Sequence, residues 1–129
     1  MNFVKNILAV GALCAAAASP TLAQNVATPE GTWQDKWGTT FTFQLCGDGT
    51  QLCGVLNDIQ GDSRTEENLA YVDQQVVQGN QVAPNEWKGN IALNGGNAEA
   101  TVELVDADTI SITGCRGIFC SSIEYERVS

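Results

Sequence analysis

Apolar and polar residues alternate along most of the chain after residue 24, and no segment there keeps a helical period over several turns. The clearest case is residues 40–46, where Phe41, Phe43 and Leu45 alternate with polar side chains. Alternation with a period of two predicts strands that face a core on one side and solvent on the other. The predicted strands are residues 32–37, 40–46, 52–59, 70–77, 87–93, 98–104, 110–113 and 123–126.

Short segments of good turn formers separate these strands, including Gly47-Asp48-Gly49 and Asn94-Gly95-Gly96-Asn97. Regular short strands joined by tight turns are typical of an antiparallel barrel or sandwich. We predict an all-β fold, a small up-and-down barrel of about eight strands. The polar segment from Asn57 to Asn68 interrupts the pattern, and we interpret it as either a lid over one barrel mouth or a solvated loop. Within it, Ser63-Arg64-Thr65-Glu66 predicts a single capped helical turn.

The first 23 residues have the three parts of a secretory signal peptide. Lys5 provides the positive charge, residues 7–18 form the apolar run, and small residues around Ala23 predict cleavage before Gln24. A run of this length is too short to span a bilayer core of about 30 Å. Cys14 follows Leu13 rather than a small residue, which argues against a lipidation site. We therefore expect residues 1–23 to be removed, leaving a single barrel domain at residues 24–129 in the periplasm or outside the cell.

The chain is acidic, with 15 Asp and Glu residues against 6 Lys and Arg residues and a formal net charge of −9. This charge disfavours nucleic acid and anionic lipid surfaces as partners. We expect no binding to nucleic acid, no membrane insertion after signal cleavage, and a monomer.

Four of the five cysteines form two close pairs, Cys46 with Cys53 and Cys115 with Cys120. Their spacings differ from the paired C-x2-C of structural zinc sites, so disulfides are favoured over metal. Three pairings are possible. In an up-and-down barrel the two loops lie at opposite ends, and a disulfide needs Cα atoms within about 7 Å. We therefore predict the two local bridges, each clamping one hairpin.

The sequence offers little for catalysis. It contains no histidine, which removes the commonest general base and metal ligand. Carboxylate pairs such as Glu124 and Glu126 fall on the outward face of a predicted strand, and Asp48, Asp58 and Asp62 lack the spacing of a known calcium loop. We predict no enzymatic activity, no cofactor and no metal.

Four aromatic residues, Phe41, Phe43, Trp87 and Tyr125, have the alternation of inward-facing positions. They either fill the barrel or line a pocket for one small ligand, since eight strands enclose room for either. We name them as candidate pocket residues.

Two motifs resemble lipocalin-like barrels. Gly31-Thr32-Trp33 matches the G-x-W that opens the first lipocalin strand, and Arg127 lies in the last strand, where that superfamily has an arginine packed across the tryptophan. The resemblance implies that Trp33 and Arg127 form a structural pair that closes the barrel.

The chain more closely resembles exported bacterial proteins of domain-of-unknown-function family 2147 (DUF2147). The similar segments are GTW, CGDGTQLCG, the W-x-G-x-I at residues 87–91, and the ending ITGCRGIFCSSIEYERV. Tyr125 replaces the Trp of the family's W-x-R ending, and the family's central segment is reduced to residues 57–68. The resemblance implies a small calycin-like barrel in the cell envelope and implies no catalytic residues.

Two functions follow as expectations. The first is a binding module that holds a small apolar ligand in the barrel. The alternative is a protein-interaction module, either a protease inhibitor or an envelope structural or stress factor, that acts through its loops or N-terminal arm. The chain is similar in its G-x-W start and disulfide to small bacterial metalloprotease inhibitors, which implies that residues 24–30 would insert into a protease.

Overall fold

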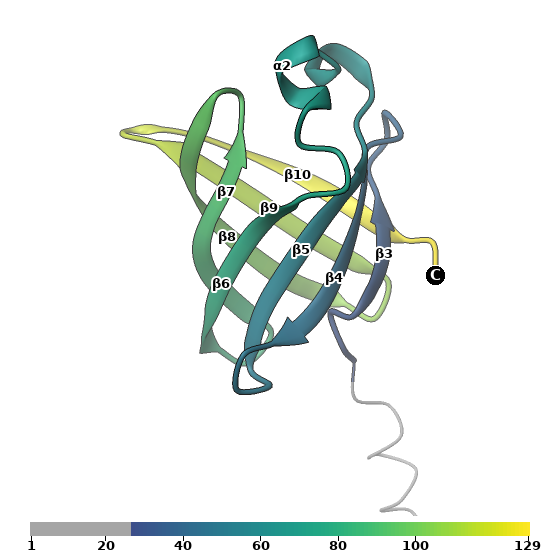
Figure 1. The fold of residues 1–129 in the computed structure, drawn as a ribbon. Helices are drawn as coiled ribbons and strands as arrows, with labels where there is room; N and C mark the ends of the chain where they lie inside the picture. Colours follow the sequence, from purple (N-terminus) through teal and green to yellow (C-terminus); the bar gives the residue numbers. More distant parts are fainter. Residues whose placement is uncertain (1–26) are drawn as a thin grey trace, which may run out of the picture.

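The computed structural model describes residues 27–129, which form a closed antiparallel barrel of eight strands (Figure 1). The order around the barrel is β10-β3-β4-β5-β6-β7-β8-β9, so each strand pairs with its neighbours in sequence and β10 closes onto β3. This confirms the predicted fold class. The strands are β3 (Gly31–Gln34), β4 (Thr40–Cys46), β5 (Gln51–Asp58), β6 (Gln75–Ala83), β7 (Glu86–Leu93), β8 (Gly96–Asp106), β9 (Thr109–Arg116) and β10 (Phe119–Arg127).

The two ends of the barrel differ in their connections. One end, at the top of Figure 1 and called the upper end here, carries a 3-10 turn η2 (Gly61–Ser63) and a one-turn helix α2 (Glu66–Leu69) between β5 and β6. The β3–β4, β7–β8 and β9–β10 turns lie at this same end, because the chain reverses at every strand. The lower end carries the β4–β5, β6–β7 and β8–β9 turns.

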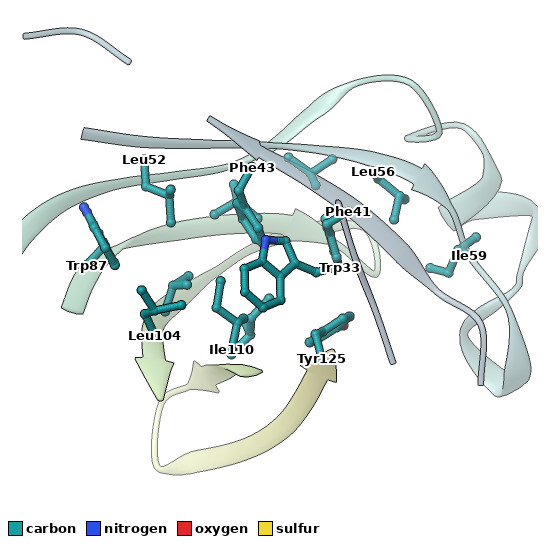
Figure 2. Close-up of a cluster of buried hydrophobic side chains, with 14 residues drawn as sticks. Trp33, Phe41, Phe43, Leu52, Leu56, Ile59, Trp87, Leu104, Ile110 and Tyr125 are labelled. Carbon is teal, nitrogen blue, oxygen red and sulfur yellow. The ribbon is translucent and has the colours of Figure 1, made fainter. Parts of the chain in front are cut away.

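The alternation in sequence becomes alternation in burial. In β8 the side chains of Ala100, Val102 and Leu104 are buried, and the residues between them are partly or fully exposed. The same pattern in the other strands builds one apolar cluster inside the barrel (Figure 2). Phe41 stacks on Phe43 with ring centroids 5.7 Å apart, and the Tyr125 ring meets Phe41 edge-on at 5.5 Å. These offset and edge-to-face arrangements are the preferred geometries of aromatic pairs.

Gly54 makes room for this cluster. A Cβ at position 54 would lie 2.5 Å from Cε1 of Phe43, so the ring occupies the space that a side chain would need. A break in the β5–β6 register follows between Gly54 and Val55. Bulges of this kind increase strand bending, which closure of a small barrel requires.

Several strands are longer than predicted, with β9 reaching Arg116 and β10 beginning at Phe119, and two predicted strands include residues that form turns. The strand predicted at 32–37 ends at Gln34, because Asp35 starts a turn in which its Oδ1 accepts hydrogen bonds from the amides of Trp37 and Thr39. The strand predicted at 70–77 instead spans Gln75–Ala83. Residues 70–74 continue from α2 as hydrogen-bonded turns, with Asp73 at a φ of 68°.

Both predicted disulfides are confirmed. The Cα atoms are 6.0 Å apart for Cys46–Cys53 and 4.1 Å apart for Cys115–Cys120. The first bridge clamps the β4–β5 hairpin at the lower end, and the second clamps the β9–β10 hairpin at the upper end. Cys115 and Cys120 face each other directly, whereas Cys46 and Cys53 are diagonal neighbours in the ladder.

The signal peptide, Cys14 and the first three residues of the predicted N-terminal arm lie outside the described residues. Within residues 27–129, none of the helices combines the length and apolar character needed to cross a bilayer.

Candidate ligand-binding cavity at the upper end

A cavity of about 530 Å³ lies at the upper end of the barrel. Its lining comes from both sides of the barrel and from the segment between β5 and β6. Six of the lining residues are buried: Asp35, Thr39, Phe41, Ile59, Ile112 and Tyr125. The others are Trp37, Gln60, Asp62, Ser63, Ile91, Leu93, Asn94, Ala98, Gly114, Cys115, Arg116, Phe119, Cys120, Ser121 and Ile123.

Apolar side chains from five strands form the walls, with Ala98 as the contribution of β8. Phe41 of β4, Ile112 of β9 and Tyr125 of β10 belong to the buried cluster, and Ile91 of β7 and Ile123 of β10 pack against it while partly exposed. The cavity thus sits on the packed core. Small inward positions help create the space, since a Cβ at Gly114 would have the Glu99 carbonyl oxygen, at 4.0 Å, as its nearest neighbour.

The rim carries exposed aromatic groups. Trp37 lies on the β3–β4 turn, and Phe119 lies on the β9–β10 hairpin beside Ile118. Lys36 lies over the Trp37 ring, with Nζ 4.6 Å from the centroid. Arg116 is the basic residue of the lining, and its Nη2 donates to the Leu93 carbonyl at 2.8 Å.

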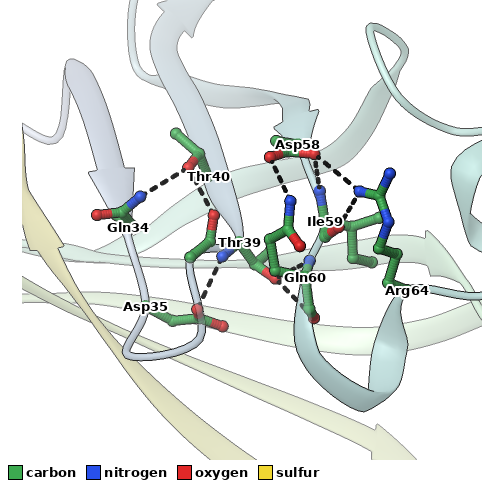
Figure 3. Close-up of polar contacts among 9 residues, drawn as sticks. Gln34, Asp35, Thr39, Thr40, Asp58, Ile59, Gln60 and Arg64 are labelled. Atoms are coloured by element: carbon green, nitrogen blue, oxygen red, sulfur yellow. Dashed lines mark hydrogen bonds and ion pairs between the residues drawn. The ribbon is translucent and has the colours of Figure 1, made fainter.

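Asp35 places a carboxylate in this cavity. It is 8% exposed, and Oδ1 accepts the backbone N–H groups of Trp37 and Thr39 at 2.9 Å each. Figure 3 shows the bond from Thr39. Among the described residues, the other carboxylate oxygen has no hydrogen bond, and Asp35 takes part in no salt bridge. The backbone amides hold the carboxylate in place without neutralising its charge.

The segment after β5 is fastened to the β3–β4 turn (Figure 3). The Gln60 amide donates to the Thr39 hydroxyl at 3.0 Å. Arg64 donates to the Ile59 carbonyl at 3.1 Å and lies 3.5 Å from Asp58. A hydrogen bond from the Gln60 side chain, aided by the Ile59 amide and the Arg64 charge, lowers the pKa of the exposed Asp58 carboxyl.

Helix α2 is fastened to the opposite rim by a buried asparagine. The Asn68 side chain donates to Ser63 O and Asn94 Oδ1, and its own oxygen accepts from the Asn94 amide at 2.7 Å. Thr65 caps the helix by accepting from the Asn68 amide at 3.1 Å, so the predicted helical turn exists with Thr65 as its cap. Because Asp62 and Ser63 line the cavity, the segment from Asn57 to Asn68 borders the upper mouth.

Tyr125 adds a buried phenol to the cavity lining. It is 6% exposed, and its hydroxyl has no hydrogen bond among the described residues. Burial, and then the negative charge of Asp35, raise the pKa of the Tyr125 hydroxyl above its ordinary value. The hydroxyl therefore keeps its proton and can both donate and accept a hydrogen bond.

The four aromatic residues predicted as pocket residues divide into two groups. Phe41 and Tyr125 line the cavity, whereas Phe43 and Trp87 lie within the buried cluster away from it. The Trp87 indole N–H donates to the Thr50 carbonyl at 2.8 Å, which ties β7 to the lower β4–β5 turn. The interior is thus filled around Phe43 and Trp87 and hollow above Phe41 and Tyr125.

Trp33 and Arg127 form a stacked pair. The Arg127 guanidinium lies 4.3 Å from the centroid of the fully buried Trp33 ring, and the two residues face each other where β10 closes onto β3. Arg127 also donates to the carbonyls of Thr28, Glu30 and Ala107. Residues 28–30 are therefore held against the lower end, and the Trp33 indole adds a bond to Pro29 O at 2.9 Å.

The other acidic residues are dispersed. Asp48 lies in the β4–β5 turn, far along the barrel from Asp62, and Glu124 and Glu126 are exposed on β10. Within the part of the chain that the structure describes, no group of three or more His, Cys, Asp or Glu residues could hold a metal ion.

Sequence reasoning missed Asp35 and Arg116 as cavity residues. Asp35 was placed inside a predicted strand, although the Asp-Lys-Trp-Gly sequence at residues 35–38 is a turn signal that could have revealed it. Arg116 lies beyond the end of the predicted strand at residues 110–113. Strand parity extended from Ile112 would have placed it on the inner side.

Comparisons with family models, with curated proteins and with solved structures give no match for this chain. Membership of family 2147 therefore stays a prediction, and the cavity is the basis for a functional proposal.

Proposed function

We propose that this protein is a non-enzymatic, exported envelope protein that binds a small apolar ligand in the upper cavity. The observation that carries the proposal is a cavity of about 530 Å³ that opens above a packed core and has Phe41, Ile112 and Ile123 in its walls. Ligand sites are typically concave, mostly apolar and supplied with a few fixed polar groups. Asp35 and Tyr125 are such groups.

The disulfides support the proposed location outside the cytoplasm. Disulfides persist in oxidising compartments such as the bacterial periplasm, and both bridges form between residues close in sequence. The signal-like N-terminus adds to this inference. Binding rather than catalysis is supported by the chemistry of the lining, which offers one buried carboxylate, one neutral phenol and no histidine.

Titration with N-phenyl-1-naphthylamine, a neutral fluorophore that brightens in apolar sites, tests the proposal. We expect saturable binding to the oxidised protein lacking residues 1–23. Gly114→Leu places an apolar side chain into the open space and should abolish binding. Ser111→Leu adds the same bulk to the outward face of the same strand and should leave binding intact. Absence of saturable binding, or equal binding by both variants, would contradict the proposal.

A second candidate function, protein interaction, has its own supporting observation. Ile118 is 89% exposed and Phe119 is 78% exposed at the tip of a hairpin clamped by Cys115–Cys120. Exposed apolar groups on a rigid hairpin are typical of a recognition loop. If this protein inhibits a metalloprotease through the tip, Ile118→Ser with Phe119→Ser should abolish inhibition. If the N-terminal arm acts instead, deletion of residues 24–26 should abolish it and the tip variant should not.

A further inference from the structure

The Asp35 carboxylate is an unusual feature of an apolar cavity. It is almost fully buried, and its hydrogen bonds come from two backbone amides that both reach Oδ1. A buried charge is unfavourable unless another charge or several hydrogen bonds compensate for it. Within residues 27–129, no Lys or Arg pairs with Asp35. The second carboxylate oxygen is left to accept a bond from whatever occupies the cavity.

The Tyr125 hydroxyl is a second buried polar group without a hydrogen-bond partner, and its residue lines the same cavity. Its ring is fixed by the edge-on contact with Phe41, and its residue is 6% exposed. A buried hydroxyl without a partner is uncommon in proteins, and each such group calls for an explanation. Both Asp35 and Tyr125 line the cavity, so one ligand group could satisfy both.

The charges around the cavity define what that group is. The ionisable side chains of the lining with formal charge are Asp35, Asp62 and Arg116, and Arg116 is exposed and already donates to the Leu93 carbonyl. An anionic ligand head would face Asp35 at close range in a low-dielectric site. A neutral head would leave the carboxylate charge unpaired, whereas a protonated amine would neutralise it and can donate up to three hydrogen bonds.

We infer that the ligand is an apolar molecule that carries a protonated amino group, which donates to the free oxygen of Asp35 and to the Tyr125 hydroxyl while the apolar body lies against Phe41 and Ile112. This inference rests on the proposed function and specifies its ligand class. Charge-assisted hydrogen bonds are roughly twice as strong as neutral ones, so the amine provides specificity within a generally apolar site.

A series of three probes with the same eight-carbon chain tests the inference by isothermal titration calorimetry near neutral pH. The probes are octylamine, 1-octanol and octanoate, each below its aggregation concentration. We expect octylamine to bind at least about tenfold more tightly than 1-octanol, and octanoate to bind most weakly. Because the wild-type protein is used, this result does not depend on the folding of any variant.

Two conservative variants then locate the interaction. Asp35→Asn keeps an oxygen for the amides of Trp37 and Thr39 and removes the charge, and Tyr125→Phe removes the hydroxyl and keeps the ring. Asp35→Asn should weaken octylamine binding by about tenfold or more and leave 1-octanol within about twofold. Tyr125→Phe should also weaken octylamine binding. Glu124→Gln removes a charge from the outward face of the same strand and should change neither affinity.

The outcomes separate the inference from the proposed function. If 1-octanol binds as tightly as octylamine, or if Asp35→Asn leaves octylamine affinity unchanged, the amine inference is overturned and the cavity remains a site for neutral apolar ligands. Tighter binding of octanoate would overturn it in the same way. If none of the three probes binds and N-phenyl-1-naphthylamine also fails to bind, both the inference and the proposed function are wrong.

Discussion

Trp33 and Arg127 join the first and last strands of the barrel, where β10 pairs with β3. This pairing covers few residues, so the ladder is short, and the stacked pair reinforces it. Arg127 also orders residues 28–30 and the β8–β9 turn through three carbonyl acceptors. The pair therefore stabilises closure of the barrel through packing and hydrogen bonding together.

Replacing either member of this pair should destabilise the protein more than replacing an exposed residue of the same strand. Trp33→Ala removes a fully buried indole and should lower the free energy of unfolding by about 3–5 kcal/mol. Arg127→Ala leaves three carbonyls without their donor and should lower it by about 2 kcal/mol or more. The control Glu124→Ala should stay within about 0.5 kcal/mol. Urea unfolding measures all three, and equal midpoints would contradict the closing role of the pair.

Tyr125 predicts a specific response to alkaline conditions. Its folded-state pKa is raised above the unfolded value of about 10, so the folded state retains a proton that the unfolded chain loses. This contribution to the free energy of unfolding is fully present below pH 10 and is lost as the pH rises further. The free energy of unfolding then falls by at most about 1.4 kcal/mol per pH unit. Tyr125→Phe should remove this slope. Urea unfolding at a series of alkaline pH values measures it, and parallel losses in both proteins would contradict the assignment.

At the scale of the elements, two short disulfides fix two hairpins at opposite ends of the barrel. The β4–β5 turn also receives the Trp87 indole, which links its clamp to the core. The β9–β10 hairpin carries its clamp near an exposed tip and beside the cavity. The two bridges lie at opposite ends of the barrel, so their stabilising effects should be independent.

Removing each bridge should therefore have an additive effect. Cys46→Ser with Cys53→Ser, and Cys115→Ser with Cys120→Ser, should each lower the free energy of unfolding by about 2–2.5 kcal/mol, as expected for loops of this length. The variant lacking all four cysteines should show the sum, because distant sites add within about 0.5 kcal/mol. Urea unfolding provides the values, with the reduced wild-type protein as a control. A combined loss well outside that margin would indicate coupling between the ends.

The elements also show what the sequence could and could not predict. Alternation identified the clearest strands, such as β4 and β8, because a barrel with one buried face preserves the period of two. The position of β6 was predicted wrongly, because residues 70–77 have a mixed apolar content and the turns after α2 depend on tertiary contacts such as the burial of Asn68. The sequence predicts all four aromatic residues as pocket residues, but only Phe41 and Tyr125 line the cavity. Strand parity gives the face that a side chain occupies but not its depth along the barrel axis, so it could not separate them from Phe43 and Trp87.

At the scale of the whole molecule, the interior has a filled part and a hollow part. Leu104 lies in the buried cluster away from the cavity, and Ile123 lies at the cavity wall and is partly exposed. A domain of this size has a small free energy of unfolding. Packing around buried residues such as Leu104 must supply most of that free energy. The upper cavity can then remain open, because the fastened segment between β5 and β6 and the Cys115–Cys120 hairpin support its rim.

This division predicts different consequences for two similar substitutions. Leu104→Ala creates a new void in a packed region and should lower the free energy of unfolding by about 2–5 kcal/mol. Ile123→Ala enlarges space that already exists and removes a partly exposed side chain, so its loss should be about 1–2 kcal/mol. The effects on the affinity for N-phenyl-1-naphthylamine should be reversed. Ile123→Ala should change the affinity, whereas Leu104→Ala, measured under conditions where it is folded, should leave the affinity unchanged. Urea unfolding and fluorescence titration of the same samples measure both quantities. Equal effects on stability and on binding would mean that the interior behaves as one continuous core, because only a divided interior separates the two measurements.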